Sequence, residues 1–346
     1  MVESIIAELF LQKNYLNGEK IKTIYYGGGT PSVLSTQELT SVFFAIRNNF
    51  TLISDPEITL EANPDDLTPA QLHALRAAGI NRLSIGIQSF HDTILTYLNR
   101  AHNGKLAERS VIDARQAGFN NISVDLIYAI PGQSDNDWIE NIQRVIDLNP
   151  EHISAYSLTI EKKTVFGHWA IQGMLKAVDD DRSAHQLELL IAMLEDAGYE
   201  QYEVSNFCRP GYLSRHNSSY WKGEKYLGVG PSAHSYNGIS RQFNSTNNAD
   251  YVRLLSRGEI PFQMEVLTRE NHINEYLMTT LRTSWGCELE KLREHFNYDI
   301  HTIHSAYIGN LLNEKLAVID GTCLKLTKKG RFMADKIASD LFVLTD

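Results

Sequence analysis

Groups that could bind a small ligand follow three apolar runs in the first third of the chain. Three glycines, Gly27–Gly29, come directly after the run IKTIYY, Glu61 ends the run EITLE, and Gln88 closes the run RLSIGIQ. Glycines let a backbone approach a ligand closely and present its N–H groups to it. A tight turn or a strand-end cap would also explain each feature by itself, so the case for a site depends on their recurrence.

Asp125 is a fourth polar group, and it lies inside the apolar run ISVDLIYAI. A buried charge is costly unless it is paired or bound to a ligand, so both a buried partner and a ligand are consistent with this position. Barrel and doubly wound enzymes bind their ligands at the carboxyl ends of parallel strands. Four successive strands that deliver such groups at the same end therefore predict one shared ligand site.

Short apolar runs alternate with amphipathic stretches of helical period through the first two thirds of the chain. This alternation is typical of parallel strands joined by helical crossovers. The expected strands are 22–26, 57–61, 82–87, 121–127, 152–158 and 200–205, and the expected helices are 36–49, 69–78, 105–117, 136–148 and 182–197.

An internal repeat supports this organisation. The segments RAAGINRLSIG, RQAGFNNISVD and EDAGYEQYEVS each end a helical pattern with Ala-Gly and then begin an apolar run. We expect Gly79, Gly118 and Gly198 to take the left-handed conformation that ends a helix. One β-α unit that recurs in this way indicates a barrel or an open doubly wound sheet.

The composition is that of an ordinary soluble globular protein. Of 346 residues, 43% are apolar and 21% are charged, and the formal net charge is −10, which disfavours a broad nucleic-acid surface. No apolar run approaches the roughly 20 residues of a membrane span, and the N-terminus has no features of a secretion signal, so we expect a cytoplasmic protein. The cysteines Cys208, Cys287 and Cys323 are too far apart in sequence to suggest a metal site and indicate separate reduced thiols.

The last part of the chain has a different pattern. Residues 268–346 read as three helices, short strands at 317–319 and 323–326, and a final helix at 329–341, which resembles a winged helix. DNA binding would require a basic face, but this segment has ten Lys and Arg against eleven Asp and Glu. A structural or partner-docking role is therefore favoured over DNA binding.

The motifs GGGTP, EANP, SIGIQSF, LNRAH and VDLIYAIPGQ, in this order, resemble the SAM-binding half of radical-SAM proteins related to anaerobic coproporphyrinogen III oxidase. The resemblance extends over essentially the whole chain. It implies that S-adenosyl-L-methionine (SAM) is a cofactor, that Arg100 lies near the SAM carboxylate, and that Gln88 and Asp125 contact the ribose. The full set of SAM positions that it implies is Gly28, Gly29, Thr30, Glu61, Gln88, Arg100, Asp125 and Thr159.

A second motif, His216–Trp221 with the sequence HNSSYW, is similar to the HNxxYW signature of HemW-type heme chaperones. Neutral imidazole is a suitable axial ligand for heme iron, which makes His216 the first heme candidate and His234 the second. Tyr220 and Trp221 could supply a flat wall for a porphyrin. The alternative is that His216 forms hydrogen bonds within a loop that closes the barrel and that Trp221 fills the core.

The pattern departs from the family at one point. Members of the family carry Cys-x3-Cys-x2-Cys, whose thiolates bind a 4Fe-4S cluster, whereas this sequence has no cysteine before Cys208. The missing motif is explained either by a chain that begins at an internal methionine or by a cluster-free homologue with only a binding role. In either case we expect no metal ligands and no catalytic residues in this chain, and no reductive cleavage of SAM.

Together these features predict an incomplete (β/α) barrel of radical-SAM type, without its first strand, over residues 1–206. An irregular aromatic segment (207–267) and a winged-helix-like α+β domain (268–346) should follow. The resemblance implies a heme chaperone that binds heme and transfers it to an unidentified acceptor protein. The alternatives are an oxygen-independent coproporphyrinogen III oxidase and a cluster-free SAM- or nucleotide-binding protein.

Overall fold

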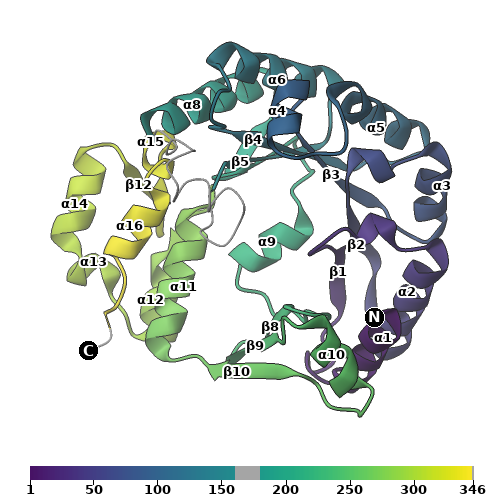
Figure 1. The fold of residues 1–346 in the computed structure, drawn as a ribbon. Helices are drawn as coiled ribbons and strands as arrows, with labels where there is room; N and C mark the ends of the chain where they lie inside the picture. Colours follow the sequence, from purple (N-terminus) through teal and green to yellow (C-terminus); the bar gives the residue numbers. More distant parts are fainter. Residues whose placement is uncertain (160–179, 345–346) are drawn as a thin grey trace, which may run out of the picture. The chain divides into compact units, whose positions relative to one another are not determined.

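The computed structural model of the chain describes residues 1–159 and 180–344. The chain divides into two compact units, and Figure 1 labels its helices and strands. The first, which we call the barrel unit, comprises residues 25–34 and 58–214. The second unit comprises residues 1–24, 35–57 and 215–346.

The main sheet has seven strands in the order β1-β2-β3-β4-β5-β7-β6. Strands β2 to β5 run parallel to one another, as the alternation of strands and helices predicts. The strands are β1 (Ile21–Tyr26), β2 (Leu52–Ala62), β3 (Arg82–Gln88), β4 (Ile122–Tyr128), β5 (His152–Ser157), β6 (Glu200–Glu203) and β7 (Asn206–Cys208).

The sequence did not predict β7. It pairs antiparallel with both β5 and β6, so it lies between the two strands that were expected to follow each other. Only two residues separate β6 from β7, and a connection that short joins antiparallel strands, because a parallel crossover needs a dozen residues or more.

Amphipathic helices precede or follow the parallel strands, and all of them except the short α4 were predicted. They are α2 (Thr36–Asn49), α3 (Pro69–Ala77), α4 (Asp92–Tyr97), α5 (Gly104–Gln116), α6 (Asp135–Leu148) and α8 (Asp180–Asp196). Ser35 caps α2 in a capping box with Glu38. The φ angles of Gly79, Gly118 and Gly198 are +97°, +88° and +82°, which confirms the predicted left-handed helix ends.

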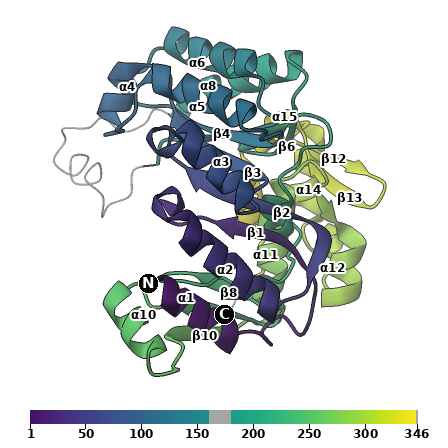
Figure 2. The ribbon, with the colours of Figure 1, turned by 90° about the vertical axis from the view of Figure 1, so that its right-hand side faces the viewer.

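The two faces of the sheet differ in polarity. Leu83, Ile85, Val124 and Leu126 are all fully buried on one face, where α5 packs against β3 and α8 against β4 (Figure 2). Alternate residues point to the opposite face, because side chains alternate along a strand. We call this opposite side the polar face; it carries Thr59, Glu61, Arg82, Ser84, Ser123, Asp125, His152 and Ser154. Most of these polar groups are buried, and Glu61 and Asp125 are the partly exposed members of the set.

The second unit begins with α1 (Val2–Leu11), whose Glu8 is fully buried. The Glu8 carboxylate accepts hydrogen bonds from Gly230 N, Asn244 Nδ2 and the Tyr251 hydroxyl. These bonds fix α1 to a segment with more regular structure than we expected for residues 207–267. That segment contains α9 (Arg215–Trp221), β8 (His234–Tyr236), β9 (Ser240–Asn244), α10 (Asn248–Leu255) and β10 (Phe262–Val266).

The C-terminal part of the second unit has the predicted helices and hairpin. Its elements are α11 (Arg269–Leu281), β11 (Cys287–Glu288), α12 (Leu289–Phe296), α13 (Ile300–Ile303), α14 (Ser305–Asn313), β12 (Ala317–Asp320), β13 (Cys323–Leu326), α15 (Lys328–Arg331) and α16 (Ala334–Asp340). The expected single final helix is divided into α15 and α16. Gly330 packs so closely on the Leu316 carbonyl that a Cβ would lie 1.9 Å from its oxygen.

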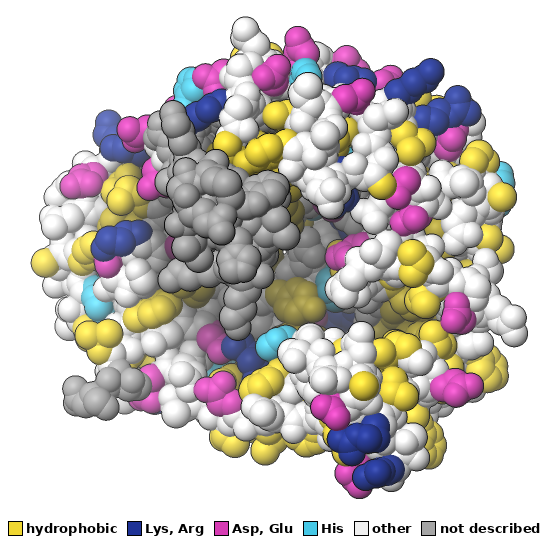
Figure 3. Space-filling model, in the orientation of Figure 1, with side chains coloured by type: hydrophobic (Ala, Val, Ile, Leu, Met, Phe, Trp, Pro, Cys, Tyr) yellow, Lys and Arg dark blue, Asp and Glu magenta, His cyan; other side chains and the backbone are white. Residues whose placement is uncertain are grey.

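Among the described helices, none has both the length and the apolar character required to cross a membrane. On the face drawn in Figure 3, lysines and arginines are scattered among acidic side chains and do not form one basic patch.

Candidate functional site

The glycine loop and Glu61 form the first part of the candidate site, in the barrel unit. Gly28 N donates to Glu61 Oε2 at 3.2 Å, and the Tyr25 hydroxyl donates to Glu61 Oε1 at 2.7 Å. Burial and the neighbouring Glu61 raise the pKa of Tyr25, which therefore remains a donor at neutral pH. A Cβ at Gly27 would lie 2.8 Å from Glu61 Oε1, so a larger residue would displace the Glu61 carboxylate from this position.

Asp125 lies on β4 one strand further along the polar face. Ser84, the register partner of Glu61, approaches both Asp125 carboxylate oxygens at 3.3 Å. Burial raises the pKa of Asp125 to about 6, with a further contribution from Glu61, while Arg82 and hydrogen bonds from Ser84 and Ser154 oppose the rise. Asp125 is therefore mostly ionised at neutral pH but lies within reach of protonation.

Arg100 and Gln88 meet at Gly86. Arg100 Nη2 donates to Asn63 Oδ1 at 2.7 Å and to Gly86 O at 3.1 Å. A Cβ at Gly86 would lie 2.9 Å from Gln88 Nε2 and 3.3 Å from Arg100 Nη2. Gln88 has a φ of +66°, an uncommon conformation that is often found at ligand sites.

The structure thus brings Gly28, Glu61, Gln88, Arg100 and Asp125 to one face of the sheet. Gly29 and Thr30 continue the glycine loop, and Thr30 precedes the 3-10 helix η1 (Pro31–Val33). Thr159 is exposed after β5, and its hydroxyl lies 3.4 Å from Ser157 O; no interaction links it to the other predicted residues.

Several residues of this cluster were missed in the sequence. Tyr25, Ser84 and Asn63 each contact a predicted ligand-facing group. The alternation of side chains along a strand could have identified Tyr25 and Ser84, because Tyr25 precedes Gly27 by two positions and Ser84 precedes Gly86 by two. Asn63 gives no such signal, because its partner, Arg100, is 37 residues away.

The cluster combines two carboxylates, one guanidinium and a glycine loop. A guanidinium binds a carboxylate well, and ionised carboxylates accept hydrogen bonds from ammonium and hydroxyl groups. The cluster therefore suits a zwitterionic amino acid that carries a sugar, and the residues present fit SAM.

His216 lies in the second unit, at the start of α9. Glu57 accepts from Arg215 N at 3.0 Å and from His216 N at 2.9 Å, so its carboxylate caps the helix. The His216 ring has its Nδ1 3.1 Å from Thr23 Oγ1 and meets Tyr220 edge-on with centroids 5.0 Å apart. The HNSSYW segment is therefore a helix, whereas one interpretation of the sequence made it a loop.

His234 and Trp221 also belong to the second unit. The exposed His234 on β8 lies 5.9 Å from the Phe243 ring. Arg282 lies over Trp221, with 5.6 Å between the guanidinium carbon and the ring centroid, and Trp221 Nε1 is buried without a hydrogen-bond partner.

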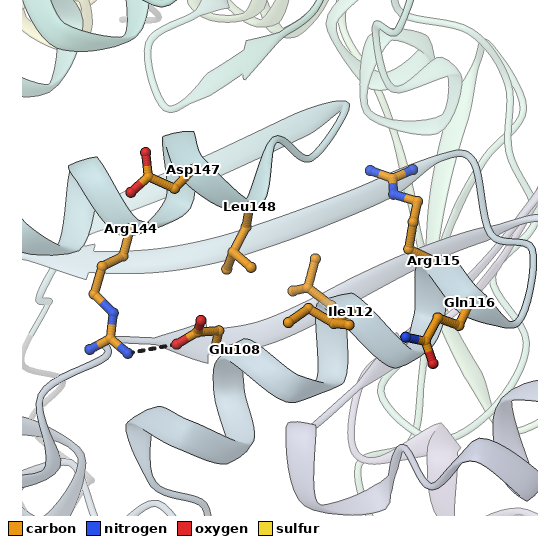
Figure 4. A pocket seen from close by; sticks show the side chains of 8 residues that line it. Glu108, Ile112, Arg115, Gln116, Arg144, Asp147 and Leu148 are labelled. Carbon is orange, nitrogen blue, oxygen red and sulfur yellow. Dashed lines mark hydrogen bonds and ion pairs between the residues drawn. The ribbon is translucent and has the colours of Figure 1, made fainter.

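A separate hollow of about 440 Å³ lies between α5 and α6 on the helical side of the barrel unit (Figure 4). Its two arginines are already paired: Arg144 contacts Glu108 at 2.9 Å, and Arg115 contacts Glu151 at 2.8 Å. With its cations neutralised, this groove provides no evident site for a charged cofactor.

The cysteines do not fit a 4Fe-4S cluster. Cys208 lies on β7 of the barrel unit, whereas Cys287 and Cys323 belong to the second unit. In the β11–β13 pair, Cys287 is opposite Leu324 and Cys323 is opposite Glu288, so these two thiols point to different faces. Three converging thiolates, which such a cluster requires, are absent from this chain.

Comparison with known proteins places this geometry in a family. Residues 4–145 match the Radical SAM superfamily, and residues 267–333 match the HemN C-terminal domain. The structure of coproporphyrinogen III oxidase (HemN) from Escherichia coli superposes with a TM-score of 0.83, covering 99% of this chain and 82% of that one at 22% identity. The chain therefore has the fold of a radical-SAM protein with a HemN-type C-terminal domain.

Two relatives narrow the assignment. The heme chaperone HemW of Mycobacterium tuberculosis is 35% identical over 336 residues, covering 97% of this chain and 84% of that protein. The heme chaperone HemW of Lactococcus lactis is 34% identical over 345 residues, covering 100% and 90%. The chain belongs to the HemW family of heme chaperones.

Proposed function

We propose that this protein binds heme and transfers it to an acceptor protein, and that its barrel unit binds SAM. The observation that carries the proposal is the likeness, over 97–100% of the chain, to proteins named as heme chaperones. The HNSSYW helix supports it, because the rings of His216 and Tyr220, one turn apart on α9, are in contact.

For SAM, the proposed contacts follow the chemistry of the polar face. Arg100 binds the carboxylate of the methionyl group, and Glu61 and the loop Gly28–Thr30 bind its ammonium group. Gln88 and Asp125 accept hydrogen bonds from the ribose hydroxyls. Thr159 is the proposed adenosine-side contact. In radical-SAM proteins SAM supplies radical chemistry when it is bound to a cluster; the residues here bind and orient it.

For heme, the proposed axial ligand is His216. The Thr23 hydroxyl lies 3.1 Å from its Nδ1, which orients the imidazole ring. His234 is the second candidate. Tyr220 supplies an aromatic wall beside the ring.

The test of heme binding is a hemin titration followed by the heme absorption band. We expect His216→Ala to weaken binding by about tenfold or more, whereas His301→Ala, at an exposed position on α13, should leave it unchanged. Equal affinity of wild type and His216→Ala would overturn the assignment of this ligand, and His234→Ala would then be examined by the same titration.

The proposed function contains no cleavage of SAM, because the residues of this chain do not provide the cluster ligands. The competing function is oxidation of coproporphyrinogen III. Formation of protoporphyrinogen from coproporphyrinogen by the purified protein would favour that enzyme, whereas stable heme binding without turnover supports the carrier.

A further inference from the structure

Arg82, at the first position of β3, is a buried cation that no predicted role explains. Its side chain is 2% exposed, and Nε has no hydrogen-bond partner. Thr59, its register partner on β2, is also fully buried with an unpartnered hydroxyl. Among residues 1–159 and 180–344, no carboxylate lies within ion-pair distance of Arg82.

A buried charge without a contact partner is costly, so it persists only where other charges compensate for it. Two positions along β3 from Arg82, on the same face, Ser84 touches the Asp125 carboxylate. Arg82 and Ser84 are therefore separated by about 6.6 Å of backbone on the same face, which puts Arg82 in the neighbourhood of the carboxylate that Ser84 touches. Arg82 accordingly attracts Asp125 through space without touching it.

The protonation of Asp125 is subject to opposing effects. Burial and Glu61 on β2 favour its neutral form, whereas Arg82 and the hydroxyls of Ser84 and Ser154 favour its charged form. The other charged or titratable groups that act on it are Tyr25 on β1, Arg100 after α4 and Tyr156 on β5. Arg82 is a buried cation near these groups, and its charge also acts on His152 and Tyr202.

We propose that Arg82 is a positioning residue of the SAM site, which acts from beneath the pocket to keep Asp125 ionised and able to accept hydrogen bonds from a diol. This inference rests on the proposed SAM function. Arg82 itself touches no ligand in this scheme. Hydrogen bonds to an ionised acceptor are roughly twice as strong as those to a neutral one, so loss of the Asp125 charge would weaken binding.

The direct test is the titration of Asp125 in the ligand-free protein, by NMR of ¹³C-labelled aspartate carboxyls assigned with Asp125→Asn. Arg82→Gln should raise the titration midpoint by about one pH unit or more, while Arg82→Lys, which retains the charge, should raise it less. Thr59→Val is the matched control, because it changes the neighbouring buried side chain without changing a charge, and it should leave the midpoint in place.

The functional test is SAM affinity between pH 6 and 9, measured by calorimetry. Arg82→Gln should bind several-fold more weakly than wild type near neutrality and recover at high pH, where Asp125 ionises without help. A purely structural defect would weaken binding equally at every pH. If Arg82→Gln does not fold, Arg82→Lys carries the test with a smaller shift of the same sign.

The outcomes separate this inference from the function on which it rests. An unmoved Asp125 midpoint, or equal SAM affinity of wild type and Arg82→Gln at every pH, overturns the role of Arg82. Failure of the wild-type chain to bind SAM at all overturns the SAM site itself, and the role of Arg82 in it falls for that separate reason.

Discussion

Asp125 shows at the scale of one residue how a buried carboxylate works against stability. Its pKa is about 6 in the folded chain, against an ordinary value of 3.8. Because folding raises this pKa, the native state holds its proton more tightly than the unfolded chain does. The contribution to stability is complete below pH 3.8 and is lost as the pH rises through about 6.

Asp125→Asn should therefore stabilise the ligand-free chain at pH 7.5, by up to about 3 kcal/mol, because the amide carries no charge to desolvate. The same substitution should weaken SAM binding. Urea denaturation and calorimetry test the two effects, with Asp147→Asn, at an exposed position on α6, as the control. A loss of stability in Asp125→Asn would contradict the argument.

SAM affinity of the wild-type chain should also depend on pH. Below about pH 6 the carboxyl of Asp125 becomes protonated and loses acceptor capacity, so the affinity should fall there. Calorimetry across this range tests the prediction, and the profile of Asp125→Asn, which cannot titrate at this position, should be flatter. Identical profiles of the two proteins would mean that Asp125 does not control binding.

Sequence reasoning at this scale found the groups that end strands and missed those that act across the sheet. Glu61, Gln88 and Asp125 stand out because each follows or interrupts an apolar run. Arg82 begins such a run and looks like an ordinary strand boundary. Its burial beside Thr59 and below Asp125 depends on the register of three strands, which local patterns do not encode.

At the scale of elements, local signals located most helices and parallel strands, because periodicity and caps are properties of short segments. These local signals gave incomplete predictions where contacts between distant segments determine the secondary structure. The strand β7 is only three residues long and is held by β5 and β6, and the final helix is interrupted at Phe332 and Met333. The α9 helix is capped by Glu57, which is more than 150 residues distant in sequence.

The Glu57 cap gives a prediction about α9. Glu57→Ala removes the acceptor for Arg215 N and His216 N, which should cost about 1–3 kcal/mol and loosen the start of the helix. Hemin affinity should fall although His216 is retained. Asp55→Asn is the control, since the Asp55 carboxylate forms an exposed ion pair with the Arg215 side chain and does not cap the helix backbone. Unchanged stability and affinity in Glu57→Ala would show that the helix does not depend on this carboxylate.

The Glu8 network gives a second prediction at this scale. Glu8→Gln places an amide where three donors converge, so at least one donor loses its acceptor. We expect a loss of about 2–4 kcal/mol in the free energy of unfolding, measured by urea denaturation. Glu3→Gln, at an exposed position of the same helix, should change it little; comparable losses in both variants would rule out a special role for Glu8.

At the scale of the whole molecule, this chain has the polar groups of the candidate SAM site but no set of thiols that could bind a cluster. The polar face retains the groups that suit SAM, whereas the thiols occupy separate positions in two units. The proposed binding and orientation of SAM depend on the polar face, whereas reductive cleavage would require three converging thiolates for a 4Fe-4S cluster. The proposed binding of SAM can therefore be measured in this chain separately from its cleavage.

Anaerobic reconstitution with iron and sulfide should therefore leave this chain without a stoichiometric 4Fe-4S cluster. Cys287 is buried in an apolar environment that raises its pKa to about 12, so its thiolate is scarcely available to iron at neutral pH. Iron analysis, the absorption spectrum and an assay for deoxyadenosine would measure the result, with hemin binding of the same sample as the control for folding. Four irons per chain together with deoxyadenosine formation would contradict the separation of binding from cleavage and would require these thiols to rearrange.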